Sequence, residues 1–294
     1  MKQALLPWLF SGMLLSWCSA YAGDIIINEI MYHPASENVA EEYIELYNTN
    51  AVALNLTGWS ITGGIGFTLP NVTIAARGYL VIAADLAVFQ AKYPTVTNVV
   101  GGWEGQLSNN DDIIRLRNAL GDLVNEVHYA DEGDWALRQR GAYDRGYYGW
   151  AWYAPHDGYA TNTANNQLES NKSLELVNLA LPNDNGQNWS ASTPANGTPG
   201  QANSTVSNNI APLIYGVAHF PPIPKSTNSV TITARIVDEN AAGPASVTLY
   251  HRNASSTSPP GFTATPMFDN GQNGDGLAND GVYGAILPAT AAGT

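Results

Sequence analysis

The chain has 294 residues and a net charge of −13, with only 12 lysine and arginine residues. Nucleic-acid binding is disfavoured, because phosphate contacts need clustered basic side chains and no dense basic run occurs. Hydrophobic residues make up 45% of the chain, which is enough for packed cores rather than disorder. The low content of charged residues, 13%, favours turn-rich β structure. The length corresponds to about two domains.

The first 22 residues have the pattern of a secretory signal peptide. Lys2 gives a positive start, residues 5–17 are apolar, and the small-x-small sequence Ala20-Tyr21-Ala22 forms a cleavage site. We expect cleavage after Ala22 and a secreted or cell-surface protein. The single cysteine, Cys18, lies in this segment, so the mature chain is expected to lack disulfides and cysteine zinc ligands. Lipidation of Cys18 is disfavoured by the bulky residue before it, and no later apolar run is long enough to cross a bilayer.

Two strands joined by a polar loop are predicted at the start of the mature chain, in residues 24–50. Side chains alternate along a strand, which places Glu29 on the same face as Ile25 and Ile27. The second strand, residues 43–48, alternates in the same way. Strands this close in sequence most simply pair antiparallel.

The β pattern continues to about residue 129. Asp85 is a candidate N-cap for a short helix with Leu86, Phe89 and Tyr93 at helical spacing, and Pro94 ends this helix. Glycines and polar residues supply turns, and the clearest hairpin has its turn at residues 119–122. Strands are expected at 58–62, 67–70, 79–84, 113–118 and 123–129.

These segments carry a family resemblance. The motifs INEI (27–30) and EYIEL (42–46), followed by LTGWS (56–60), GYLVIA (78–83) and LSNNDDIIRL (107–116), resemble the bacterial lamin tail domain. The resemblance implies an all-β, immunoglobulin-like β-sandwich, which we place at residues 23–189. It also implies binding or positioning roles at the cell surface, often beside hydrolases, nucleases or CotH-type kinase-like domains.

An aromatic-rich insertion, residues 130–171, interrupts the regular pattern and is expected to be a long loop, of the kind that is often functional. Exposed aromatic rings stack on sugars or fill partner pockets. The alternative is a satellite core that holds the loop down, and the tendency of large aromatics to be buried favours it. The candidate ligand or partner surface consists of Trp135, Trp150, Trp152, Tyr153 and Tyr159.

The chain after this insertion returns to a strand at residues 173–178 and then changes composition. Residues 190–209 are rich in Pro, Gly, Ser, Thr and Asn, and we expect a linker there. Residues 210–294 resemble the immunoglobulin-like modules found beside lamin tail domains in large exported bacterial proteins. About seven strands make a sandwich, and fewer are expected here, so we expect a truncated, incomplete second β-sandwich domain. Its expected strands are 215–220, 230–237, 246–252, 262–268 and 282–287.

The strongest local pattern for chemistry is the acidic loop 269–280, DNGQNGDGLAND. Calcium loops need several oxygen ligands on a sharply turning backbone. Against the twelve-residue EF-hand register, Asp269, Asn273, Gly274 and the final carboxylate match, whereas a glycine at one ligand position and an Asp in place of the final Glu depart from it. The alternative is a hairpin loop in which Asn and Gly supply positive φ. The candidate calcium ligands are Asp269, Asn273, Asp275 and Asp280.

A second acidic set consists of Glu29, Glu42 and Glu45 with His33. One histidine and several carboxylates can bind a metal or act as acid and base. Strand alternation argues against their convergence and no metal-ligand spacing is present, so structural roles are favoured. No GxSxG, P-loop, GxGxxG or HExxH motif occurs in the chain.

The sequence therefore favours a non-catalytic, exported interaction or scaffolding protein, monomeric, with a protein or glycan partner at the cell surface. Two alternatives stay open. The chain could hold the accessory domains of a larger secreted enzyme, such as a hydrolase, nuclease or CotH-type protein, whose catalytic part lies beyond residue 294. It could also be a glycan-binding surface module. Calcium is the only cofactor with a candidate site, and no transmembrane segment is expected.

Overall fold

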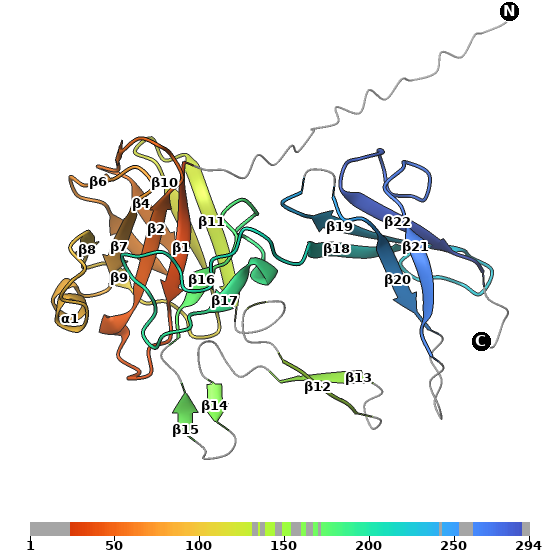
Figure 1. The fold of residues 1–294 in the computed structure, drawn as a ribbon, viewed down its shortest axis with the longest axis horizontal. Coiled ribbons are helices and arrows are strands. Elements are labelled where there is room, and N and C mark those ends of the chain that lie inside the picture. The colour runs from red at the N-terminus through yellow and green to blue at the C-terminus, as the bar shows by residue number, and fades with distance from the viewer. Residues whose placement is uncertain are drawn as a thin grey trace, which may run out of the picture.

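The structure is a computed structural model that describes residues 24–289 with several gaps. Two β-rich lobes follow each other along the chain (Figure 1). Among the described residues, no helix has the length and apolar character needed to cross a membrane. The expected signal peptide lies outside the described residues, as do the gaps at 131–134, 136–138, 145–148, 154–159, 163–166, 170–171, 241–242 and 253–260.

The first lobe is a sandwich of two sheets. One sheet has the strand order β17-β16-β1-β2-β7-β8, and the other has the order β11-β10-β4-β5-β9. Buried side chains from both sheets form one core, as expected for an immunoglobulin-like sandwich. The first sheet contains β1 (Ile25–Met31), β2 (Tyr43–Asn48), β7 (Tyr79–Ala83), β8 (Val99–Gly101), β16 (Leu174–Leu176) and β17 (Trp189–Ala191). The second contains β4 (Ser60–Gly63), β5 (Ile65–Thr68), β9 (Glu104–Gly105), β10 (Asp111–Arg117) and β11 (Leu123–Ala130), while β3 (Leu54–Asn55) pairs with β6 (Thr73–Ile74).

A bulge in β1 decides which side chains reach the core. Ile27 pairs with Leu46 and Glu29 pairs with Glu45, so β1 has one residue more than β2 between these two pairs. Neighbouring residues in β2 point to opposite faces, and Glu29 therefore lies on the face opposite to Ile27. The simple alternation that placed these two side chains together is wrong, because it assumes a regular strand through Asn28.

The outer face of the first sheet carries a second, smaller core beneath helix α1 (Leu86–Lys92). The Asp85 side chain caps this helix by accepting hydrogen bonds from the backbone N–H groups of its first turn, as expected. Phe89 of the helix packs edge-on against Tyr43 of β2, with 5.6 Å between the ring centroids. The buried members of this core are Met31, Tyr43, Val81, Ala83 and Phe89.

The segment 190–209, expected to be a linker, packs on the first lobe for most of its length. Residues 193–207, called the strap below, follow β17 and lie against the outer face of β16, β1 and β2. The backbone N–H groups of Thr198 and Gly200 in the strap donate hydrogen bonds to buried glutamates of these strands. The small residues that suggested a linker instead let the strap backbone approach the sheet, as Gly197 shows below.

The aromatic-rich insertion was expected to be a long loop, and its described parts contain two short hairpins instead. In the first, β12 (Gln139–Asp144) pairs with β13 (Gly149–Tyr153). In the second, β14 (Ala160–Asn162) pairs with β15 (Gln167–Glu169).

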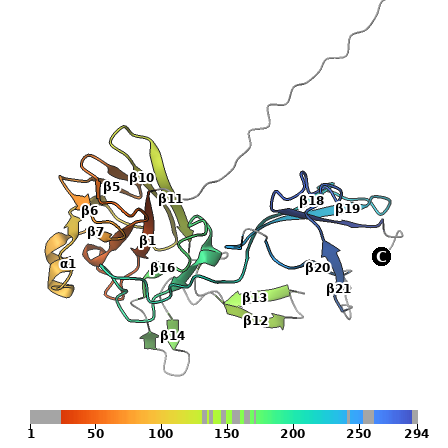
Figure 2. The same cartoon turned by 45° about the horizontal axis from the view of Figure 1, so that its top comes forward.

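The second lobe has five strands within the described residues, in the expected places. The three-stranded sheet has the order β18-β19-β22, and β20 pairs with β21. Figure 2 shows the β20–β21 hairpin diverging from the three-stranded sheet. The buried core is small and consists of Ala234, Ile236, Met267 and Ala285. The strands are β18 (Leu213–Phe220), β19 (Val230–Val237), β20 (Val247–His251), β21 (Thr263–Met267) and β22 (Val282–Leu287).

One side-chain amide joins the two lobes. Gln187 lies in the short 3₁₀ helix η2 (Gly186–Asn188) of the first lobe. Its Nε2 donates to the Ile214 carbonyl oxygen at 2.6 Å, and the Ile214 N–H donates to its Oε1 at 2.7 Å. The Gln187 amide therefore binds β18 in the way that a peptide group of a neighbouring strand would.

Candidate functional site: a buried glutamate row

Three glutamates lie side by side on the outer face of the first sheet. Glu29 of β1 is directly opposite Glu175 of β16 on one side and Glu45 of β2 on the other. All three are fully buried. Directly opposed residues on one face of a sheet have Cβ atoms about 5 Å apart. These residues, called the glutamate row below, thus place three carboxyl groups in one layer that is shielded from water.

Glu29 accepts three hydrogen bonds on a single oxygen. Its Oε1 lies 2.8 Å from the Thr198 backbone nitrogen, 2.7 Å from the Tyr43 hydroxyl and 2.5 Å from Ser173 Oγ. A Cβ added at Gly197 would lie only 2.1 Å from this oxygen, so the strap backbone lies directly on the carboxyl group. The second oxygen, Oε2, is buried and has no hydrogen-bond partner among the described residues.

The other two glutamates also hold the strap. Glu45 accepts a hydrogen bond from the Gly200 N–H at 2.5 Å and one from Asn28 Nδ2 at 2.8 Å. Among the described residues, the donors to Glu175 all belong to the strap: the Thr198, Ser204 and Thr205 hydroxyls and the Thr205 N–H. The row therefore acts as a set of acceptors for the N–H and O–H groups of the strap.

Asn203 anchors the strap between two strands. Its Nδ2 donates to the Leu176 carbonyl oxygen of β16 at 2.8 Å and to the Asn28 carbonyl oxygen of β1 at 3.0 Å. Asn28 Nδ2 in turn donates to Asn203 Oδ1 at 2.8 Å. Buried amides need such partners, and this pair extends the polar layer of the glutamate row.

Burial controls the electrostatics of the row. Removal from water raises the pKa of Glu29 to about 7, and the charge of Glu175 adds to this rise. Hydrogen bonds from Ser173, Thr198 and Tyr43 to Glu29 oppose it without overcoming it. Burial and the neighbouring Glu29 charge raise the pKa of Glu45 well above its usual value. The unpaired Oε2 of Glu29 makes the charged form of this residue costly for the same reason, and the raised pKa values of Glu29 and Glu45 favour their protonated forms near neutral pH.

The second acidic set of the sequence analysis separates in the structure. Glu42 follows the 3₁₀ helix η1 (Val39–Glu41) and accepts a hydrogen bond from the Leu107 N–H at 2.9 Å. Burial raises its pKa to about 7. His33 Nε2 lies 3.4 Å from a carboxylate oxygen of Glu37. Neither joins the row, whereas Glu29 and Glu45 converge on a third glutamate that the sequence reasoning missed.

The sequence around Glu175 contains a local signal for the third member of the row. Glu45 and Glu175 each lie between two aliphatic residues, in Ile44-Glu45-Leu46 and Leu174-Glu175-Leu176, whereas Glu29 lies between Asn28 and Ile30. A carboxylate between aliphatic residues is expected to face water only if that face of the strand is exposed. The strap covers that face here, and its sequence shows no apolar pattern that would have predicted the covering.

The acidic loop 269–280 directs its carboxylates at its own backbone. Asp275 is 2% exposed and accepts hydrogen bonds from the N–H groups of Asn270, Gly271 and Asn273. Asp269 accepts from the N–H groups of Asp280 and Gly281. Among the residues that the structure describes, no group of three or more His, Cys, Asp or Glu could hold a metal ion. These bonds fit the hairpin-loop alternative, and calcium binding stays a prediction.

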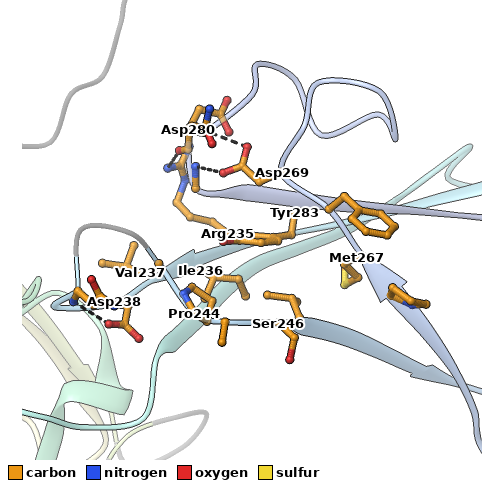
Figure 3. A pocket seen from close by; sticks show the side chains of 18 residues that line it. Arg235, Ile236, Val237, Asp238, Pro244, Ser246, Met267, Asp269, Asp280 and Tyr283 are labelled. Carbon is orange, nitrogen blue, oxygen red and sulfur yellow. Dashed lines mark hydrogen bonds between the residues drawn. The ribbon is translucent and has the colours of Figure 1, made fainter.

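A cavity of about 720 Å³ opens in the second lobe between its two sheets (Figure 3). Figure 3 shows Asp269 and Asp280 at its edge beside Arg235, whose Nη1 donates to the Asp280 carbonyl oxygen at 3.0 Å. Apolar core residues, among them Ile236 and Met267, form part of the wall. The cavity is the space that the diverging sheets of this lobe leave between them.

Of the predicted aromatic surface, only Trp135 has a described side chain. It is half-buried and packs against the main core, with its ring centroid 6.0 Å from that of Trp189. This contact is what the satellite-core alternative predicts for Trp135. Tyr159 and the side chains of Trp150, Trp152 and Tyr153 lie outside the described residues.

The two lobes are β-rich modules whose sheets are consistent with immunoglobulin-like sandwiches. The family model of the lamin tail domain matches residues 19–131, and that of the conditioned medium factor second Ig-like domain matches residues 225–294. The chain thus contains a lamin tail domain followed by an Ig-like domain, as its motifs predict. A comparison with curated proteins gave no match. Glu175 and the strap lie after the residues that the lamin tail model matches.

Proposed function

We propose that this chain is a non-catalytic, exported interaction module, in which the lamin tail domain is the scaffold and the Ig-like lobe provides the contact surface. The distribution of exposed apolar side chains carries this proposal. Fourteen large hydrophobic residues are exposed in the described structure, and nine of these lie at residues 214–286 of the second lobe. Exposed apolar side chains that are concentrated in one region of a protein support an interaction role for that region.

Strand β18 has the features of such a contact surface. It pairs with β19 alone among the described strands, and on its other edge the Gln187 amide occupies Ile214, so no strand covers the part of that edge after Ile214. Val217 and Phe220 of this strand are 67% and 70% exposed, and Ile223 after it is 88% exposed. An open strand edge with apolar side chains invites the addition of a partner strand.

The proposed setting is the cell exterior. The signal-peptide pattern of residues 1–22 supports export. The net charge of −13 supports a protein or glycan partner rather than a nucleic acid.

The test compares the full-length protein with a double variant, F220S/I223S, that makes the β18 surface polar. Each protein is immobilised and used to capture surface proteins of the cells that secrete it. We expect the wild type to retain a specific partner and the double variant to lose it. Leu120→Ser is the matched control, because Leu120 is also 88% exposed but lies in the β10–β11 turn of the first lobe. Equal capture by all three proteins, or capture by none, would contradict the proposal.

A further inference from the structure

Beyond this proposed function, we propose that the glutamate row and the strap form a proton-dependent clasp between the two lobes. When Glu29 and Glu45 of the row carry their protons, the strap is held on the sheet. When these two residues are ionised, the strap is released, and the Ig-like lobe remains attached through a longer and freer tether.

The strap is attached directly to the row, and the Asn203 amide and the Asn196 carbonyl oxygen hold it beside the row. The strap has no titratable side chain, and its N–H and O–H groups bind all three carboxyl groups. A Cβ added at Gly197 would also lie 2.1 Å from the Tyr43 hydroxyl and 2.5 Å from Ser173 Oγ. The strap backbone is therefore in direct contact with the polar layer. Ionisation of Glu29 would place a negative charge directly against this backbone.

The other titratable groups around the row do not change charge near neutral pH. Tyr43 of β2, Tyr79 of β7 and Tyr93 after α1 face it, and burial raises the pKa of each, to about 12 for Tyr79. Beyond Tyr93, Glu41 is paired with Lys92 at 2.5 Å. Glu29 and Glu45 are thus the groups of this layer whose raised pKa values bring their titration towards neutral pH.

The direction of the response follows from linkage. A released strap exposes the row to water, which returns the Glu29 pKa towards its ordinary value of 4.5 from about 7. Between these two pH values the closed clasp binds more protons than the open one. The closed state is therefore fully favoured below about pH 4.5 and loses stability as the pH rises towards 7. Glu45 adds to this loss, because burial and the Glu29 charge also raise its pKa well above the usual value.

Release of the strap changes how the lobes are connected. The strap is the covalent path from β17 of the first lobe to β18 of the second. Once free, it could extend by on the order of 50 Å. The Gln187–Ile214 pair is solvent-exposed and lies outside the strap, so release of the strap does not break this contact between the lobes.

Amide hydrogen exchange of the full-length protein at pH 5.5 and pH 8.5 tests the clasp, with rates corrected for the intrinsic effect of pH. The reporters are the strap amides of Thr198 and Gly200. We expect their protection to fall by about tenfold or more at the higher pH, since each unit of pKa shift corresponds to a factor of ten. In the variant E29Q/E45Q, whose side chains are neutral and similar in shape, we expect the strap to stay protected at both pH values.

Two further variants complete the design. Glu42→Gln removes a buried carboxyl group with a raised pKa that contacts Leu107 rather than the strap, so the pH response of the strap should persist. Single E29Q replaces the double variant if the latter does not fold, and we expect a smaller pH response than in the wild type. Unchanged protection in the wild type, or an equal fall in the glutamine variants, would overturn the clasp.

Discussion

Glu29 illustrates at the residue scale how a buried carboxyl group can be held without a cation. Its hydrogen bonds all fall on Oε1, while Oε2 has no partner among the described residues. The charged form loses its hydration on burial, and three donors on one oxygen do not compensate for this loss. A neutral group of the same shape should therefore fit the site better at alkaline pH.

We accordingly expect Glu29→Gln to stabilise the first lobe at pH 8, by up to about 3 kcal/mol if the full pKa rise is relieved. At pH 5 the wild-type group is already protonated, and the variant should melt within about 1 kcal/mol of wild type. Thermal unfolding followed by calorimetry at both pH values measures this. A lower melting temperature for the variant at pH 8 than for the wild type would contradict the account of the row.

Gly197 is a second residue on which the packing of the strap depends, because it has no Cβ atom. Its φ is +76°, and an added Cβ would clash with Glu29 and Tyr43. We expect Gly197→Ala to cost roughly 3 kcal/mol or more of unfolding free energy, from steric overlap together with backbone strain. Gly121 is the matched control, since its φ is +89° and its Cβ would meet nothing within 4 Å.

Gly121→Ala should therefore cost about 1 kcal/mol from strain alone. Urea denaturation of the two variants and the wild type gives the comparison. Equal losses for both variants would show that the strap does not press on the glutamate row.

At the scale of elements, local sequence predicts much of the fold. Hydrophobic alternation predicted the β10–β11 hairpin and the strands of the second lobe, because each of these elements is specified by its own residues. Asp85 followed by helical spacing predicted α1 for the same reason. The family motifs predicted the sandwich itself.

The bulge in β1 could not be predicted in this way. The Ile27 N–H donates to Asn125 Oδ1 at 2.9 Å, and Asn183 Nδ2 donates to the Ile27 carbonyl oxygen at 3.0 Å. These partners are 98 and 156 residues away in sequence, so the local pattern holds no sign of them. Without the bulge, Glu29 would be placed on the core face, and the row would not be visible in the sequence.

The packing of the strap on the sheet cannot be predicted from local sequence for a related reason. Its Thr, Ser, Gly and Asn residues are typical of a flexible linker when they are considered alone. The same small polar groups are what a buried set of carboxyl acceptors needs as donors. Only the positions of Glu29, Glu45 and Glu175 on three neighbouring strands reveal that need, and Glu175 is far from the other two in sequence.

The connection between the lobes is a property of the whole molecule. The Gln187 amide makes two hydrogen bonds with Ile214, and both bonds are exposed. Exposed hydrogen bonds contribute little to unfolding free energy, but two of them on one rigid amide fix an orientation.

We therefore expect Gln187→Ala to leave the melting of both lobes within about 0.5 kcal/mol of wild type and to broaden the distribution of interlobe distances. Small-angle X-ray scattering at pH 5.5, where the clasp is closed, measures this broadening. Gln201→Ala in the strap is the matched control, because Gln201 is an exposed glutamine and should leave the scattering curve unchanged. Identical curves for all three proteins would contradict an orienting role for Gln187.

The pH dependence of stability should distinguish the two lobes. Burial raises the pKa of Glu29, Glu42 and Glu45 in the first lobe, so its folded state binds more protons than its unfolded state above about pH 4.5. Its stability must then fall as the pH rises from about 4.5 to 7, the reverse of a domain held by ionised carboxylates. Calorimetric scans of the full-length protein from pH 5 to pH 8 should show one transition moving to lower temperature while the other, from the Ig-like lobe, moves less. If both transitions stay fixed over this range, the buried carboxyl groups are ionised in the folded state, and the row is held by hydrogen bonds alone.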